Sequence, residues 1–227
     1  MPRSDTPPEL RAAAVGGPAD GRPGRDAPLW ILVVITAIGP VALNLFVPSM
    51  PAAQRGLGLS DAAIQLTLTL YLVALAGAQL IYGPVSDRFG RKPPLIFGML
   101  CLALGSVVAG FAEDAVQLVS GRVLQAIGGC SGLVLGRAMI RDRHDPSEAA
   151  SRIATVTLAM MLAPMLTPAV GGYVDQWLGW RAGFWVITSI AAAIFVAVTL
   201  RLPETHHDRR PMPGLVPMLR AYRGLLA

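Results

Sequence analysis

Charge is scarce in this chain of 227 residues, because only 15% of them are Asp, Glu, Lys or Arg while 53% are hydrophobic. Charged residues make up about a quarter of an ordinary soluble domain. The shortage therefore argues against a soluble globular domain. The apolar residues gather in blocks of roughly twenty, the helix length needed to cross a hydrocarbon core about 30 Å thick. This composition indicates a membrane protein.

Side chains that bind metals or carry out catalysis are also few. The chain has three histidines and two cysteines, namely His144, His206, His207, Cys101 and Cys130. Both cysteines fall inside apolar blocks without metal-ligand spacing, and we interpret them as packing residues. The His-His-Asp run at 206–208 can chelate a metal weakly, but solvated polar residues are the better interpretation. With no glycine-rich phosphate loop either, we expect no enzyme, no metal and no cofactor.

Six apolar blocks are long enough to cross a membrane as helices. We expect these helices at residues 29–51, 62–84, 94–112, 115–139, 153–174 and 182–201. The sequence therefore predicts an all-α membrane protein in which six transmembrane helices form one bundle over residues 29–201.

The segments before and after the bundle differ from it in composition. Residues 1–28 are rich in Pro, Gly and Ala with mixed charges, and we expect a disordered cytoplasmic tail. Residues 202–227 are expected to form a cytoplasmic segment. Within it, residues 215–226 place apolar side chains at helical spacing with Arg220 and Arg223 between them, which predicts a helix lying on the membrane surface.

The nineteen basic residues are distributed unequally between the two sides of the expected bundle. Four precede the first span, three follow the second, three follow the fourth and five follow the sixth, so fifteen lie on one side. By the positive-inside rule that side is cytoplasmic. We therefore expect a multi-pass protein of the cell membrane, the inner membrane of a bacterium, with both termini in the cytoplasm. The positive charge reports this topology, and no nucleic-acid partner is expected.

The densest cluster of charge lies in GPVSDRFGRKP, residues 83–93, between the second and third spans. Topology alone accounts for basic residues there, but not for glycines and an acidic residue placed among them. We expect the Gly-Pro pair to end the second helix and Gly90 to allow a tight reversal. Asp87 is placed to cap the next turn or to pair with Arg91. The loop is therefore predicted to be a rigid clip between helices.

This stretch resembles motif A of the major facilitator superfamily, which lies in the cytoplasmic loop between spans two and three. In that superfamily the charged residues of the motif interact with the cytoplasmic end of the fourth span and lock the outward-facing state. The resemblance assigns a conformational latch to Gly83, Asp87, Arg88, Gly90, Arg91, Lys92 and Asp142. Protonation of an acid or sliding of the helices would release such a latch.

A charge also occurs inside the fourth span, where it is expensive. Arg122 lies about 10 Å along the helix axis into the membrane, and Gln125 shares its face of the helix. Either Arg122 snorkels to the outer interface, or it faces a wet central cavity and binds an anion or influences a proton site. The pair resembles motif B of the superfamily, RxxQ, whose arginine faces the central cavity and takes part in proton coupling. We favour the second interpretation.

The same span carries Gly128, Gly132 and Gly136 at a spacing of four residues. Small residues at this spacing form a ridge on which another helix can lie at close backbone distance. We interpret the ridge as a packing feature and not as a binding site.

The fifth span contains the stretch APMLTPAVGG, residues 163–172. Each proline removes a backbone hydrogen bond, so a bend is expected. A structural kink is one interpretation. The stretch also resembles motif C, the GPxxGG pattern of exporters in this superfamily, although Thr167 replaces the glycine before the second proline. The resemblance assigns the bend to Pro164, Pro168, Gly171 and Gly172.

The first two spans resemble a particular branch, the bicyclomycin-resistance (Bcr/CflA) drug:proton antiporters, through LNLFVPSMPA at residues 43–52 and the whole second span. Members usually carry an aspartate where this chain has Asn44, and an amide cannot load or release a proton. No Asp, Glu or His is expected inside any of the six spans. The resemblance implies export of small molecules in exchange for protons, with one cavity wall formed by Asn44, Tyr71, Gln79, Arg122 and Gln125.

The resemblance covers one half of a major facilitator, whose two six-helix bundles hold the substrate between them. Alternating access therefore requires a second six-helix half or another copy of the chain, and the expected partners are a small-molecule substrate, protons and the lipid bilayer. The alternative is a protein that does not transport, either a truncated relic or a membrane partner that modulates an intact transporter.

Overall fold

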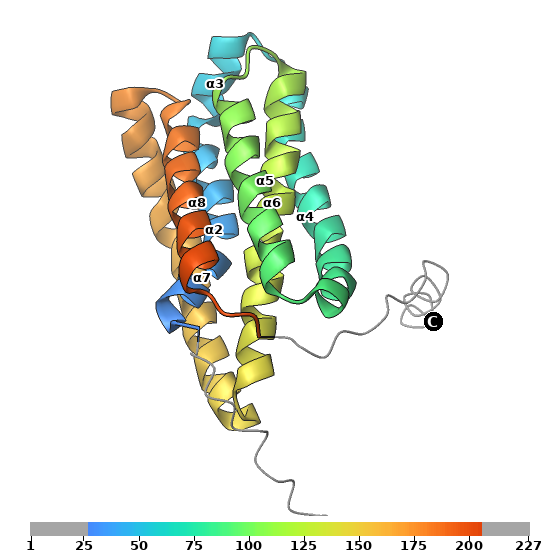
Figure 1. The fold of residues 1–227 in the computed structure, drawn as a ribbon. Helices are drawn as coiled ribbons and strands as arrows, with labels where there is room; N and C mark the ends of the chain where they lie inside the picture. The colour runs from blue at the N-terminus through green and yellow to red at the C-terminus, as the bar shows by residue number, and fades with distance from the viewer. Residues whose placement is uncertain (1–26, 206–227) are drawn as a thin grey trace, which may run out of the picture.

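The computed structural model describes residues 27–205, which form helices without a β-strand in that range (Figure 1). The predicted tail, except for its last two residues, and the predicted interfacial helix at 215–226 lie outside the described residues. The elements are α2 (Leu29–Phe46), a 3-10 turn (Val47–Ser49), α3 (Met50–Leu57), α4 (Asp61–Phe89), α5 (Lys92–Gly110), α6 (Ala115–Arg143), α7 (Pro146–Leu178) and α8 (Ala182–Arg201).

The six predicted spans are confirmed, because six helical segments are long and apolar enough to cross a membrane within the described part of the chain. The first of them runs from α2 through the 3-10 turn into α3. Four of the six spans extend well beyond the predicted bounds: the first reaches residue 57, α4 reaches residue 89, α6 reaches residue 143 and α7 runs from 146 to 178. The last turns of α6 and the first turns of α7 project past the rest of the bundle (Figure 1). These added turns carry charged residues that a hydropathy pattern alone assigns to loops.

The prediction that the Gly-Pro pair ends the second span is wrong, because α4 continues through Pro84 to Phe89. Membrane helices tolerate proline where other groups satisfy the freed backbone atoms. The helix ends instead at Gly90, whose φ of 89° is left-handed and suits glycine.

The fourth span, α6, occupies the centre of the bundle and packs against α2, α4 and α5. It is the most buried of the six spans, whereas α4 and α7 leave most of their apolar length uncovered. Large exposed apolar side chains follow one another along α7, namely Leu158, Met161, Leu162, Met165, Leu166 and Val170. The bundle therefore has a closed core around α6 and two open flanks.

The glycine ridge on α6 serves two neighbours rather than one. A Cβ on Gly128 would collide with the backbone of Leu102 in α5. A Cβ on Gly132 would collide with the carbonyl of Ile35 in α2. Four residues advance a helix by about 400°, so successive ridge positions turn by about 40° around the axis. This drift directs one end of the ridge toward α5 and the other toward α2.

Substituting Gly132→Ala should destabilise the bundle by about 1–3 kcal/mol, because the added methyl group must push α2 away from α6. Thermal unfolding of the purified chain in detergent measures the change. Gly77→Ala is the matched control, since a Cβ there meets nothing within 4 Å, and alanine should stabilise the exposed helix by up to about 1 kcal/mol. Equal melting temperatures for the two variants would contradict the close packing of α2 on α6.

Candidate functional site

Arg91, in the turn between α4 and α5, is the centre of a charged cluster. Its Nη1 donates to Oδ1 of Asp87 at 2.7 Å and to the hydroxyl of Ser86 at 2.5 Å. Its Nε donates to Oδ2 of Asp142 at 2.8 Å. The guanidinium is thus shared between the end of α4 and the end of α6, which is a link between two helices that could move relative to each other.

The unexpected extra turns of two helices build this cluster. Asp87 lies in the last turn of α4, beyond the proline that we expected to end the helix. Asp142 lies in the last turn of α6, three residues past the predicted end of the span. The left-handed Gly90 then reverses the chain and brings Arg91 back between the two carboxylates.

Sequence reasoning missed Glu204, which follows α8 and joins the same cluster. Its carboxylate accepts hydrogen bonds from the backbone N–H groups of Arg91 at 2.8 Å and Lys92 at 3.1 Å. A carboxylate is favourable there because the N-terminus of a helix carries partial positive charge. A Cβ on Gly90 would lie 2.7 Å from the carboxylate oxygen, so close approach as well as backbone angle favours glycine. An acidic residue directly after the last span was the available signal.

Two further bonds attach the segment after α8 to the rest of the cluster. Arg143, at the end of α6, donates to the backbone carbonyl of Glu204 at 3.2 Å. The Lys92 ammonium donates to the carbonyl of Thr199 in α8 at 3.0 Å. The ends of α4, α6 and α8 and the start of α5 are therefore connected at one surface of the bundle. From here on we use the name latch for the cluster of Asp87, Arg91, Lys92, Asp142 and Glu204, which keeps four of the seven residues first assigned to it and adds Glu204.

The carboxylates that bind Arg91 raise the pKa of its guanidinium. Burial lowers the pKa of Arg91, but hydrogen bonds and charges from Asp142 and Asp87 outweigh it, so the pKa is raised above the ordinary arginine value. Arg91 therefore keeps its proton at any working pH.

Substituting Glu204→Gln should destabilise the chain by about 1–3 kcal/mol, because two backbone donors lose a charged acceptor. Thermal unfolding in detergent is the measurement. Glu148→Gln is the control, since Glu148 forms an exposed pair with Arg152 within one helix, and such pairs contribute under about 1 kcal/mol. If Glu148→Gln lowers the free energy of unfolding as much as Glu204→Gln does, the hydrogen bonds of Glu204 to the start of α5 contribute no more than an exposed ion pair.

A second cluster surrounds Arg122, whose side chain is 0% exposed in the centre of the bundle. Its Nη1 donates to the carbonyl of Ala42 at 3.0 Å and to Oε1 of Gln125. The guanidinium lies 4.3 Å from the ring centre of Tyr71 and 5.0 Å from that of Phe46. The snorkelling interpretation is therefore wrong, because the side chain points into the protein and not to the interface.

Arg122 has no carboxylate partner among the described residues. Its Nε and Nη2 are buried without a hydrogen-bond partner in the same range. A buried charge without a counter-ion is costly, and aromatic rings offset part of that cost through cation–π attraction. Two donors and a positive charge are therefore enclosed in the described bundle without a hydrogen-bond partner or a counter-ion.

Neighbouring polar groups hold this cluster in place. Gln125 donates to the hydroxyl of Ser106 on α5 at 2.7 Å, and Ser106 donates to the carbonyl of Leu102 at 2.8 Å. The hydroxyl of Tyr71 donates to the carbonyl of Gly39 on α2 at 3.0 Å. Four helices thus fix the orientation of the residues around Arg122. Sequence reasoning named Tyr71 and Gln125 but missed Phe46 and Ser106, which carry no signal in an apolar run.

The structure does not bring all five predicted cavity residues together. Asn44 donates to the carbonyl of Pro40 in its own helix at 2.8 Å. It lies two residues from both Ala42 and Phe46, which puts it about 200° around α2 from the residues that contact Arg122. Gln79 is exposed on α4. Only Tyr71, Arg122 and Gln125 form a connected group.

The proline and glycine stretch of the fifth span lies within one continuous helix. α7 runs through Pro164 and Pro168 without interruption. A Cβ on Gly171 would collide with the carbonyl of Leu45, and one on Gly172 would contact the ring of Pro48. The stretch is therefore a packing surface for the end of α2.

The six long apolar helices of the described bundle are those of a multi-pass membrane protein. The comparison with protein families makes this specific, because the model described as Major Facilitator Superfamily matches residues 29–223. The chain belongs to this superfamily.

Several proteins are similar to the chain in sequence. A bicyclomycin resistance protein homolog from Haemophilus influenzae is 30% identical over 182 residues, covering 80% of this chain and 46% of that protein. A chloramphenicol resistance protein from Pseudomonas aeruginosa is 33% identical over 184 residues, covering 81% of this chain and 44% of that protein. The chain thus spans about half the length of the curated relatives it matches.

Solved structures show the same fold at low sequence identity. A peptide transporter POT in complex with alafosfalin superposes with a TM-score of 0.70 and 16% identity, over 87% of this chain and 44% of that one. The human organic anion transporter MFSD10 gives a TM-score of 0.65 and 19% identity, over 84% of this chain and 51% of that one. The likeness confirms the predicted fold of one major facilitator bundle.

Proposed function

We propose that this chain forms one six-helix bundle of an exporter of small drug-like molecules that works by alternating access. The observation that carries the proposal is the latch, in which Arg91 joins the ends of α4 and α6 through Asp87 and Asp142. Ionic contacts at the ends of helices are suited to a device with two arrangements, because they form in one and separate in the other. The names of the drug-resistance relatives support the direction and the substrate class.

The proposed orientation puts the latch and both termini in the cytoplasm of a bacterial cell, with the bundle in the inner membrane. The basic residues at the latch end support it through the positive-inside rule. A second bundle, from another chain or from a copy of this one, would cover the exposed apolar flanks of α4 and α7. The substrate would lie between the two bundles, and it would reach the fully buried Arg122 only when the helices move apart.

Accumulation of chloramphenicol tests this proposal in cells that lack their own drug exporters. The chain is produced with a six-helix second half of a bicyclomycin-resistance relative as a separate polypeptide. We expect less drug to accumulate than with the second half alone, and Asp142→Asn in the same pair should reverse the effect. Unchanged accumulation with both bundles present in the membrane would reject the exporter. The alternative, a membrane partner that modulates an intact transporter, predicts altered efflux only in cells that retain a complete exporter.

The proposal includes exchange for protons, although α2 offers Asn44 and not an acid. Substituting Asn44→Asp should make efflux depend more steeply on the proton gradient, because a carboxyl can load and release a proton. Drug-induced proton release from inverted membrane vesicles measures the coupling, and Asn44→Gln is the control that adds no titratable group. An equal proton yield from the aspartate and glutamine variants would show that this position takes no part in coupling.

A further inference from the structure

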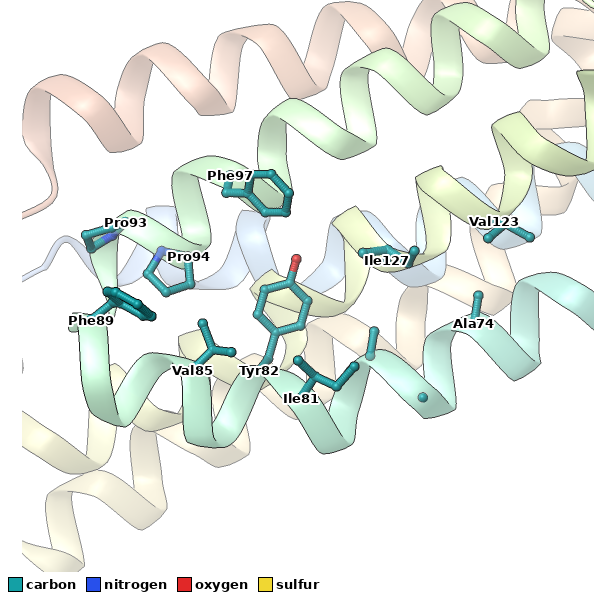
Figure 2. Close-up of a pocket in the computed structure, with 12 residues that line it drawn as sticks. Ala74, Ile81, Tyr82, Val85, Phe89, Pro93, Pro94, Phe97, Val123 and Ile127 are labelled. Atoms are coloured by element: carbon teal, nitrogen blue, oxygen red, sulfur yellow. The ribbon is translucent and has the colours of Figure 1, made fainter. Parts of the chain in front are cut away.

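Groups that exchange a proton near neutral pH are rare in the described bundle. The pocket of about 630 Å³ between α4 and α5 has Tyr82 as its one lining residue with a polar side-chain atom (Figure 2), and tyrosine titrates only at about pH 10. Histidine changes its charge between about pH 5 and 8. His144 is the only histidine among residues 27–205. A pH change near neutrality therefore acts on this part of the chain most directly through His144.

His144 lies in the short turn between α6 and α7, at the end where these two helices project past the bundle (Figure 1). Only 5% of its side chain is exposed. Its ring Nδ1 lies 3.0 Å from the backbone carbonyl oxygen of Ile140. Because a carbonyl can only accept, Nδ1 carries the proton of the neutral ring, and Nε2 then has a lone pair and no proton.

The second ring nitrogen faces a carboxylate. Nε2 of His144 is buried without a hydrogen-bond partner among the described residues. It lies 3.8 Å from Oε1 of Glu148, in the first turn of α7. This distance is too long for a hydrogen bond, and two acceptors do not attract each other. A proton on Nε2 would turn the same contact into an ion pair with a donor between the two groups.

Charges of both signs surround the turn. Glu148 is also bound by Arg152, and Arg143 donates to the carbonyl of Glu204. The negative end of the α6 dipole favours a cation at His144, whereas burial and the arginines of α6 oppose it. Helix α2, which packs against α7, has no charged side chain. The charged residues at this end of α6, α7 and α8 are Arg141, Asp142, Arg143, Asp145, Glu148, Arg152, Arg201 and Glu204.

We propose that His144 is a proton-binding switch between α6 and α7. When it takes a proton from solvent, its Nε2 donates to Glu148 and ties the end of α6 to the start of α7. When it is neutral, this tie is absent and Glu148 stays bound to Arg152. Asp142 of the latch lies two residues before His144, so acidification at this end of the bundle steadies the part of α6 that the latch uses. The switch does not depend on the substrate or the direction of transport.

Hydrogen exchange of the purified full chain in detergent tests the switch at about pH 5.5 and about pH 8, on either side of the range in which histidine titrates. After correction for the intrinsic effect of pH on exchange, peptides covering residues 140–150 should exchange about two- to tenfold more slowly at the acidic pH. His144→Asn should remove this difference, because its amide replaces Nδ1 as the donor to Ile140 but does not titrate. His144→Gln is the second variant if the asparagine variant does not fold.

Two variants of α7 test the partner of His144. Glu148→Gln should remove most of the pH-dependent difference, because the ring loses its carboxylate. Arg152→Gln is the matched control, since it removes the other partner of the same carboxylate and should keep the difference.

A pH-dependent difference that persists in His144→Asn would overturn the switch. A difference that disappears in His144→Asn but is unchanged in Glu148→Gln would overturn the assignment of Glu148 as the partner. Neither result bears on the exporter proposal, because hydrogen exchange is measured without transport.

Discussion

Replacing Arg122 with glutamine should lower transport by the assembled transporter on the order of 100-fold, which corresponds to about 3 kcal/mol, while the bundle keeps its stability. Arg122 has a positive charge and two buried donors without partners in the described residues. Removing a buried charge that has no counter-ion costs little, and it can stabilise a protein. The same change removes the positive charge that Arg122 would present to a substrate, or to a carboxylate of the second bundle, once the helices move apart.

Efflux and thermal unfolding of the same Arg122→Gln preparation separate the two effects. Arg122→Lys is the informative second variant, because lysine keeps the charge but loses the planar fork that contacts Ala42 and Gln125. If charge alone matters, the lysine variant should retain much of the activity. A glutamine variant that melts at a much lower temperature would show instead that Arg122 holds the helices together, and that its role is structural.

Substituting Asp142→Asn should open the latch and increase hydrogen exchange at residues 83–95 by about 10- to 100-fold. The change removes one of the two carboxylates that bind Arg91. A hydrogen bond to a charged group contributes about 1.5–3 kcal/mol, which corresponds to that range in an equilibrium constant. In the assembled transporter the same loss should shift the population away from the state in which the latch is closed.

Hydrogen exchange followed by mass spectrometry measures this prediction peptide by peptide. Asp61→Asn is the control at the opposite end of α4, where the exposed Asp61 accepts from Gln54 at 2.5 Å. It should leave exchange at residues 83–95 unchanged. Unaltered exchange in the Asp142 variant would mean that Asp87 and Glu204 are sufficient to hold the turn, and that α6 is not part of the latch.

Much of this fold could be predicted from the sequence, because a bilayer imposes a simple rule of length and hydropathy. Every span of twenty apolar residues must satisfy its own backbone, so helices were the expected outcome at each block. The ends of the helices were less predictable. Pro84 is a reliable helix breaker in water, but α4 continues past it to the charged turn that ends at Gly90.

The contacts of the candidate sites could likewise be predicted only in part. The Asp87–Arg91 pair was predictable, because four residues separate partners that lie close together in sequence. Glu204 was not, since its contact with Arg91 spans 113 residues and depends on where α8 ends. Asn44 and Arg122 illustrate the opposite error: both were assigned to one cavity wall, yet the rotation of α2 turns Asn44 away.

Composition and local spacing were sufficient to predict the six membrane-spanning helices, the side of the membrane with more basic residues and the charge pattern of the loop after α4. Each of these follows from composition or from spacing within one segment. The enclosure of Arg122 by Phe46 and Tyr71, and the capping of α5 by Glu204, became apparent from the packing of the helices. These contacts depend on how each helix is rotated about its axis and how far it is shifted along the membrane normal. Close packing at glycines such as Gly132 fixes both, and a hydropathy pattern contains no information about either.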